Sequence, residues 1–149
     1  MALASLTACS PYKVVDYPSA LDEAPTEVWL DWDDSKSRMG KKSEAEWLAK
    51  RSERAQKRHA RLKETLPDGY ASELASRLPE GVSVNWGEAP ADALRLDLSV
   101  KGWVEGVYVP NAENPGAGSV PTTVQLQVDF VQGGEPMESI EIRCWVQSQ

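Results

Sequence analysis

A strict alternation of apolar and polar residues in the second half of the chain restricts its fold more than any other feature. The alternation covers residues 94–101, 124–130 and 140–146, and each segment carries an apolar side chain at every second position. A period of two is typical of a β-strand with one face in a core and the other in water. Such strands favour an antiparallel sheet that is covered on one side only. Gly102, directly after the first segment, is expected to mark a β-bulge.

Two further short strands are expected at residues 27–32 and 82–86, with a helical region between them. Ser43 and Glu46 have the spacing of a capping box, so a long basic helix is predicted at 44–66. Pro67 and Gly69 separate it from a shorter amphipathic helix at 68–78. The prediction is a two-layer α+β domain with a mostly antiparallel sheet of about five strands and both helices on one face.

The chain has 149 residues, enough for one domain with a single core. Hydrophobic residues make up 41% and charged residues 26%, a balance typical of a folded chain. Residues 27–149 are expected to form the α+β domain. Residues 10–26 are rich in Pro, Asp, Glu and Ser and are expected to form a tether, with an extended piece at 13–17 that can add to a sheet edge.

The stretch Leu6-Thr7-Ala8-Cys9 resembles the lipobox of bacterial lipoproteins, in which small residues precede a cysteine that is acylated and becomes the mature N-terminus. This resemblance implies that residues 1–9 are a residual signal and lipobox segment and that Cys9, its last residue, carries lipid chains such as palmitate. Ser10 after the cysteine is similar to the pattern of lipoproteins sorted to the outer membrane. The implied location is the periplasmic face of the outer membrane, with a lipid as the membrane anchor.

Two other fates of the cysteines stay open. Cys9 can be an ordinary thiol in a tail, or it can form a disulfide with Cys144, the second cysteine of the chain. If Cys9 is acylated, Cys144 is expected to be a small buried core residue. The sequence does not decide whether Cys144 is free or disulfide-bonded.

The second half of the chain also resembles a family of bacterial envelope proteins. The segments "ALRLDLSVKGWVEGVY", "NPGAGSVPTTVQLQVDF" and "GGEPMESIEIRC" are similar to the strand–loop–strand–strand pattern of the TolB amino-terminal-domain-like group, with the resemblance covering about residues 27–147. The long basic helix departs from the shorter helix of that group. The resemblance implies a periplasmic binding or assembly module without catalytic residues or cofactors.

Positive charge is concentrated in one segment. The chain has a net charge of -7, yet residues 36–63 hold eleven of its sixteen Lys and Arg residues and three Glu. The basic helix contributes the candidate binding residues Lys50, Arg51, Arg54, Lys57, Arg58 and Arg61. They can form a solvated helix face, or bind anionic lipid, nucleic acid or an acidic protein surface. Nucleic acid is the less favoured partner, because the acidic remainder of the chain repels a duplex.

Residues 31–34 resemble the first motif of haloacid-dehalogenase-type phosphatases, which implies a nucleophilic Asp31, an acidic Asp33 and Mg²⁺. The alternative is that Asp33 and Asp34 are turn residues. The remaining strands do not show the pattern of a parallel sheet that this family requires. His59 is the one histidine, and it has no partner at metal-ligand spacing. We therefore expect no catalytic residue, no metal site and no cofactor.

A second candidate surface is the polar face of the sheet. Trp29 and Trp145 are in phase with the polar residues of their strands, and an aromatic patch there is a plausible recognition surface. The candidate partner-binding residues are Trp29, Trp145, Arg143 and Gln127 on this face, with Asn111 and Asn114 in the long connection before residue 121.

Together these features favour a non-enzymatic, lipid-anchored module that binds or assembles another envelope component. The alternative is a cytoplasmic binder of nucleic acid or acidic protein that uses residues 44–66, and a more remote one is a Mg²⁺-dependent phosphatase with its site at residues 31–34. The sequence identifies neither the ligand, nor the oligomeric state, nor the pathway.

Overall fold

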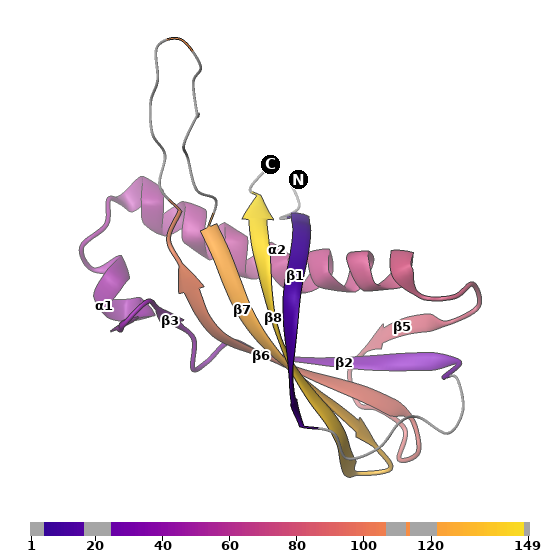
Figure 1. Cartoon of the computed structure of the whole chain (residues 1–149). Helices are drawn as coiled ribbons and strands as arrows, with labels where there is room; N and C mark the ends of the chain where they lie inside the picture. The colour runs from indigo at the N-terminus through magenta and orange to yellow at the C-terminus, as the bar shows by residue number, and fades with distance from the viewer. Residues whose placement is uncertain (1–4, 17–24, 107–112, 114–121, 148–149) are drawn as a thin grey trace.

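The computed structural model describes residues 5–16, 25–106, 113 and 122–147, and within them it is an α+β fold of one mixed eight-stranded sheet and two helices (Figure 1). The strands follow the order β1-β8-β7-β6-β2-β5, and the small strands β3 and β4 lie off this path, with β3 beside β6. The strands are β1 Ser5–Asp16, β2 Glu27–Asp33, β3 Arg38–Met39, β4 Lys42–Ser43, β5 Ser83–Trp86, β6 Leu94–Val104, β7 Thr122–Gln132 and β8 Glu135–Gln147. The helices are α1 Glu44–Leu48 and α2 Glu53–Arg77.

The three long alternating segments form the antiparallel half of the sheet, as the sequence predicts. β6 pairs with β7, and β7 pairs with β8. Every second side chain enters the core because of the strand pleat, and the register places apolar residues opposite one another, as in Leu98 opposite Val128 and Leu126 opposite Ile142. The register shifts between Val100 and Gly102, which is the bulge expected at this glycine.

The other half of the sheet is parallel, and the prediction of a mostly antiparallel sheet is wrong there. β2 pairs in parallel with both β5 and β6. The chain leaves β2, crosses the sheet through α2 and returns as β5, so the two strands run in the same direction. The crossover through α2 covers one face of these parallel strands and leaves their other face exposed to water. Alternation along β2 and β6 is therefore compatible with either strand direction.

The predicted helices differ from those in the structure. The capping residue is correct, because the Ser43 side chain accepts a hydrogen bond from the backbone N–H of Glu46. The helix that begins there ends at Leu48, and Ser52 caps a second helix that continues through Pro67 to Arg77. The long basic helix at 44–66 and the amphipathic helix at 68–78 are thus replaced by a one-turn α1 and a continuous α2.

The first strand also differs from expectation. The sequence predicts a tether at residues 10–26, whereas residues 5–16 form the edge strand β1, antiparallel to β8. The expected extended piece at 13–17 overlaps the end of this strand. Residues 17–24 of the predicted tether lie outside the described part of the chain.

Both helices lie on the apolar face of the sheet, and α2 runs across several strands (Figure 1). In the middle of α2, Leu66 is fully buried in one core cluster with Val100, Trp103 and Leu126. Its second half packs on a second cluster around Leu30 and Leu96, where the partly buried members include Tyr70, Ala71, Leu74 and Leu78. The opposite face of the sheet carries the polar residues. This arrangement places the start of α2, with its positive charges, at one end of the molecule.

Candidate functional site: a basic groove beside Trp47

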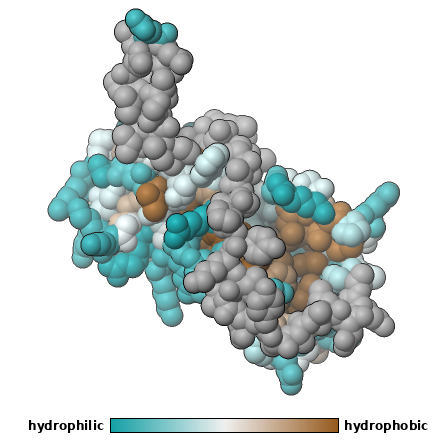
Figure 2. Space-filling model, in the orientation of Figure 1, coloured by the Kyte–Doolittle hydropathy of each residue, from teal (hydrophilic) through white to brown (hydrophobic). Residues whose placement is uncertain are grey.

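The basic residues gather at the end of the molecule formed by the β3–β4 hairpin, α1 and the start of α2. Figure 2 shows hydrophilic residues over this end, where Figure 1 places α1 and β3. Seven of the cations form no ion pair with another described residue, and all are exposed: Arg38, Lys41, Lys42, Lys50, Arg54, Arg58 and Arg61. Exposed cations that form no ion pair are available to an anionic ligand, although Arg38 also donates to the Lys41 carbonyl at 2.6 Å. We call this set the basic end.

The part of α2 within the basic end has a one-sided charge distribution. Arg54, Lys57, Arg58 and Arg61 recur at intervals of three and four residues, so they share one side of the helix. His59 and Leu66 lie on the buried side. Lys57 forms an exposed ion pair with Glu53 at 2.9 Å, a type of contact that contributes little to stability. The sequence-predicted basic residues thus do lie together in the structure.

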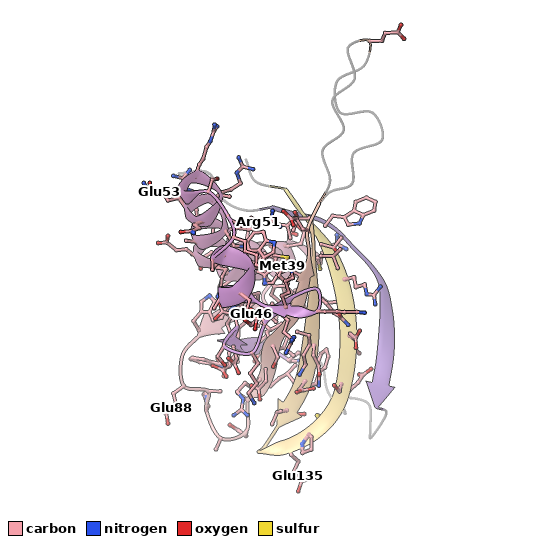
Figure 3. All side chains as sticks on the ribbon, turned by 90° about the vertical axis from the view of Figure 1, so that its left-hand side faces the viewer. Met39, Glu46, Arg51, Glu53, Glu88 and Glu135 are labelled. Atoms are coloured by element: carbon pink, nitrogen blue, oxygen red, sulfur yellow. The ribbon has the colours of Figure 1, made fainter. Side chains whose placement is uncertain are left out.

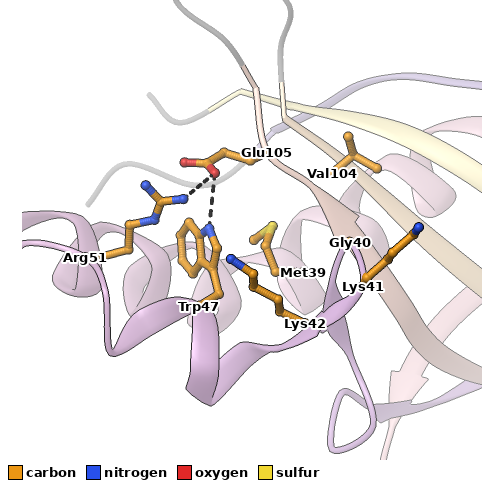
Figure 4. A pocket seen from close by; sticks show the side chains of 8 residues that line it. All are labelled: Met39, Gly40, Lys41, Lys42, Trp47, Arg51, Val104 and Glu105. Carbon is orange, nitrogen blue, oxygen red and sulfur yellow. Dashed lines mark hydrogen bonds and ion pairs between the residues drawn. The ribbon is translucent and has the colours of Figure 1, made fainter.

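A groove of about 290 Å³ opens beside these cations (Figure 4). Its lining residues are Met39, Gly40, Lys41, Lys42, Trp47, Arg51, Val104 and Glu105. In Figure 4, Lys42 extends toward Trp47 from the hairpin, whereas Lys41 extends away from it. Figure 3 views this end of the molecule and shows Arg51 and Met39 close together near its centre. The groove therefore joins a basic rim to a small apolar surface.

Two donors in the groove converge on one oxygen atom. Trp47 donates its indole N–H to Oε2 of Glu105 at 3.1 Å, and Arg51 donates from Nη2 to the same oxygen at 2.7 Å. The Arg51 guanidinium also lies over the Trp47 ring, 4.8 Å from its centroid. The arrangement is a binding site for one carboxylate oxygen, and Glu105 of this chain occupies it.

The Trp47 ring contacts a row of aromatic rings that are tilted and edge-on to one another and lead into the core. His59 lies 5.2 Å from Trp47 and 5.3 Å from Trp103, which is 1% exposed. The Trp47 ring therefore has Arg51 over one face and the tilted His59 ring as a further neighbour. What Trp47 offers to a ligand is its N–H donor.

The histidine is itself fixed by the carboxylate of Glu44. His59 Nε2 lies 2.5 Å from Oε1 of Glu44, while Ser37 Oγ and Lys63 Nζ donate to Oε2, the lysine at 3.0 Å. Burial raises the pKa of Glu44, but the hydrogen bonds from Ser37, His59 and Lys63 outweigh burial and lower the pKa below the ordinary 4.5. An ionised Glu44 only accepts hydrogen bonds, so it holds together the elements under the groove.

The polar face of the sheet does not bring the two predicted tryptophans together. Trp29 pairs with Arg95, near the start of β6. Trp145 lies level with the other end of β6, because it pairs with Thr123, and Thr123 pairs with Val104. Trp145 is 52% exposed, as expected. Trp29 is only partly exposed, and its indole nitrogen is buried. The expected shared aromatic patch is therefore not formed.

The centre of this polar face is acidic. Asp31, Asp97 and Asp129 are direct neighbours across β2, β6 and β7. Gln127 donates to Asp129 at 3.1 Å and to Ser139 at 3.3 Å, so its amide is used within the sheet. Arg95 pairs with Asp97 at 2.6 Å, so Asp31 and Asp129 leave the centre of this face with a net negative charge, which disfavours an anionic partner.

Three other predicted partner residues have different outcomes. Arg143 is exposed and lies opposite Gln125 in the register. Asn111 and Asn114 lie outside the described residues. The structure therefore does not unite the predicted partner-binding residues in one site.

The Asp31–Asp34 segment is divided between two surroundings. Asp31 is exposed on the polar sheet face, and Asp33 turns back to accept hydrogen bonds from the backbone and the hydroxyl of Ser35 at 2.9 and 2.6 Å. These hydrogen bonds lower the pKa of Asp33. Asp34 lies 3.8 Å from Lys63. Among the described residues, no group of three or more His, Cys, Asp or Glu side chains could hold a metal ion.

The structure places the cysteines in a specific relationship. Cys144 is fully buried and disulfide-bonded, and the backbone of Cys9 lies directly opposite it in the β1–β8 register. The sequence has one other cysteine, Cys9, so we infer that Cys9 is the disulfide partner of Cys144. A sulfur that forms a disulfide cannot also carry a thioether-linked lipid. Acylation of Cys9 remains a prediction, and it now competes with this bond.

No family model matches the chain, and no curated protein or solved structure matches it either. None of the described helices is both long and apolar enough to span a membrane. Sequence reasoning did not single out Glu105, because it contacts Trp47 and Arg51 across more than fifty residues of chain. The one available signal was an acidic residue four positions beyond the predicted strand at 94–101.

Proposed function

We propose that this chain is a non-enzymatic module of the bacterial envelope that binds another envelope component through its basic end. The observation that carries the proposal is the convergence of Arg51 and the Trp47 N–H on one carboxylate, beside Lys42 and the unpaired cations of α2. A carboxylate-binding geometry with surplus positive charge suits an anionic partner. The acidic polar face leaves this end as the favoured surface.

The disulfide of Cys144 supports the envelope rather than the cytoplasm as the compartment. Structural disulfides persist in the periplasm and outside the cell, and cytosolic reductants remove them. The cytoplasmic alternative, a binder of nucleic acid or acidic protein, uses the same cations but needs Cys144 reduced.

The lipid anchor belongs to the proposal as one of two forms of the chain. In the anchored form, Cys9 is acylated at the outer membrane and Cys144 is a thiol; in the other form, the two cysteines are joined. Cleavage before Cys9 would also remove residues 5–8, which belong to β1. The remote phosphatase alternative predicts Mg²⁺-dependent turnover that is lost in Asp31→Asn.

Binding at the basic end is tested with three anionic probes: hexaglutamate peptide, phosphatidylglycerol vesicles and duplex DNA. We expect at least one to bind at low salt, with an affinity that falls as salt is added. Changing Arg54, Arg58 and Arg61 to Gln should weaken that binding at least tenfold.

The matched control changes Arg77, Lys101 and Arg143 to Gln, which removes the same charge elsewhere. If the control weakens binding as much as the basic-end variant, the site is not at the basic end. The absence of binding to every probe at low salt would overturn the proposed function.

A further inference from the structure

We infer that Glu105 occupies the place of a partner's carboxylate, and that the groove binds an acidic segment of a protein once Glu105 is displaced. The inference rests on the proposed function, because it assigns a ligand class to the same basic end. It concerns the groove lined by Lys42, Trp47, Arg51 and Glu105.

The contacts of Glu105 show that the site is built for a carboxylate. One oxygen atom of Glu105 accepts from both Trp47 Nε1 and Arg51 Nη2, at 3.1 and 2.7 Å. The Arg51 guanidinium is positioned by the Trp47 ring, and the ring is positioned by His59. Donors that are fixed in this way do not have to be reorganised when a carboxylate from another chain replaces the internal one.

Displacement of Glu105 is energetically inexpensive. The side chains of Arg51 and Glu105 are 38% and 47% exposed, and an exposed ion pair of this kind contributes little to stability. The exchange needs only a change of side-chain rotamer, because the backbone on both sides of Glu105 stays with the sheet, through β6 before it and through the Gly106 N–H donated to Thr122 Oγ1 after it. The internal contact is therefore weak enough to be exchanged.

The surroundings of the pair favour a protein partner over a lipid surface. The two donors point to one atom inside a groove, a directional arrangement that suits a single carboxylate. The 62% exposed Val104 provides apolar surface beside it for a neighbouring side chain, and the buried Met39 forms the floor beneath. A flat anionic bilayer would use the positive charge of the basic end alone.

The test compares binding of hexaglutamate to Glu105→Gln and to Glu46→Gln. Glu46 is exposed on α1 at the same end of the molecule, so its variant removes the same charge without opening the site (Figure 3). We expect Glu105→Gln to raise the affinity about two- to fivefold, and Glu46→Gln to raise it distinctly less. Equal gains in the two variants would overturn the inference.

A double-mutant cycle separates displacement from a general charge effect. If Glu105 acts by occupying Arg51, the gain from Glu105→Gln should vanish in an Arg51→Gln background. A gain that persists there contradicts the inference, and so does an equal gain for phosphatidylglycerol vesicles. If wild type binds hexaglutamate through the basic end while Glu105→Gln gives no gain, this inference fails and the proposed function stands. Equal unfolding midpoints of the variants and wild type serve as the folding control.

Discussion

His59 Nε2 lies 2.5 Å from Oε1 of Glu44, and this contact joins α1 to α2 across the break between the two helices. Both side chains are largely buried, with 6% and 14% of their surface exposed. Glu44 also accepts from Ser37 in the segment before β3, so one carboxylate ties three segments together. These segments carry the groove, and their geometry depends on this carboxylate.

Replacing Glu44 with Ala should lower the free energy of unfolding by about 1–3 kcal/mol, because His59 and Ser37 lose their buried acceptor. Urea unfolding at neutral pH measures the change. The matched control is Glu46→Ala, which removes an exposed carboxylate from the same helix and should change stability by less than about 0.5 kcal/mol. Equal losses in the two variants would show that the Glu44 cluster does not stabilise the fold.

The same carboxylate should make stability depend on acid. The pKa of Glu44 is lower in the folded chain than its ordinary 4.5, so its ionised form is favoured by folding. Its contribution is complete above the ordinary pKa and is lost as pH falls through the lower folded pKa. In Glu44→Gln, the decline of unfolding free energy below about pH 5 should therefore be shallower than in wild type. A parallel decline in the two proteins would contradict the assignment.

The disulfide of Cys144 predicts a chain that is stabilised by oxidation. The reduced protein should be less stable by about 2–4 kcal/mol in urea unfolding. Cys9→Ser should match the reduced wild type, and reductant should change it no further. If reductant still destabilises Cys9→Ser, Cys9 is not the partner of Cys144.

Intact-mass analysis of the exported chain separates the two fates of Cys9. A disulfide removes two hydrogen atoms from the full sequence, whereas lipidation removes residues 1–8 and adds acyl chains. For the chain in which β1 is paired with β8, we expect the mass of the full sequence less two hydrogen atoms. A mass that shows acylation and the loss of residues 1–8 would contradict this expectation and would favour the lipid-anchored chain.

Pro67 marks a limit of sequence reasoning about helices. Proline lacks the N–H for the helical hydrogen bond, and this predicts a boundary at 67. The structure continues α2 through it, because Leu66 and Tyr70 on either side pack into the two core clusters. Burial on both sides of the proline outweighs the lost hydrogen bond.

Pro67→Ala should therefore stabilise the protein. A proline inside a helix destabilises the folded state by about 3 kcal/mol. Proline also restricts the unfolded chain, which offsets up to about 1 kcal/mol of this loss. We expect a gain of about 1–2 kcal/mol in urea unfolding. Pro79→Ala, beyond the C-cap Leu78, is the control and should give no gain. A loss of stability in Pro67→Ala would mean that the proline is needed where it lies.

The sequence was sufficient for residues whose environment is decided locally. Alternation identified β6, β7 and β8 and their buried faces, Gly102 marked the bulge, and Ser43 capped α1. Strand direction was not local, since alternation is the same in parallel and antiparallel strands when one face is wet. The Gln127 amide shows the same limit, because its hydrogen bonds with Ser139 depend on pairing with β8.

The groove was predictable only in part. Its cations Lys41, Lys42 and Arg51 were evident from the density of positive charge in residues 36–63. The Glu105 contacts depend on tertiary packing that brings the end of β6 beside α1. No residue spacing in the sequence indicates that Glu105 contacts Trp47 and Arg51, so this carboxylate site could not be predicted.

Tyr70 provides a spectroscopic test of how α2 is held on the sheet. It lies 6.3 Å from Trp32 between ring centroids and packs against both core clusters. Burial raises the pKa of Tyr70 to about 12, since a phenolate is poorly solvated there. In an alkaline titration followed by tyrosinate absorbance, the step near pH 12 should be absent from Tyr70→Phe.

The raised pKa of Tyr70 also determines the direction in which the free energy of unfolding changes as pH rises. The neutral phenol is favoured by folding, so its contribution is complete below the ordinary pKa of 10.0 and is lost as pH rises toward about 12. Tyr70→Phe should therefore lose stability more slowly than wild type between pH 10 and 12, while its unfolding at pH 7 tests whether packing is kept. If the titration step near pH 12 persists in Tyr70→Phe, the buried phenol is not the group that titrates. The middle of α2 would then be more open to water than its packing against Trp32 requires.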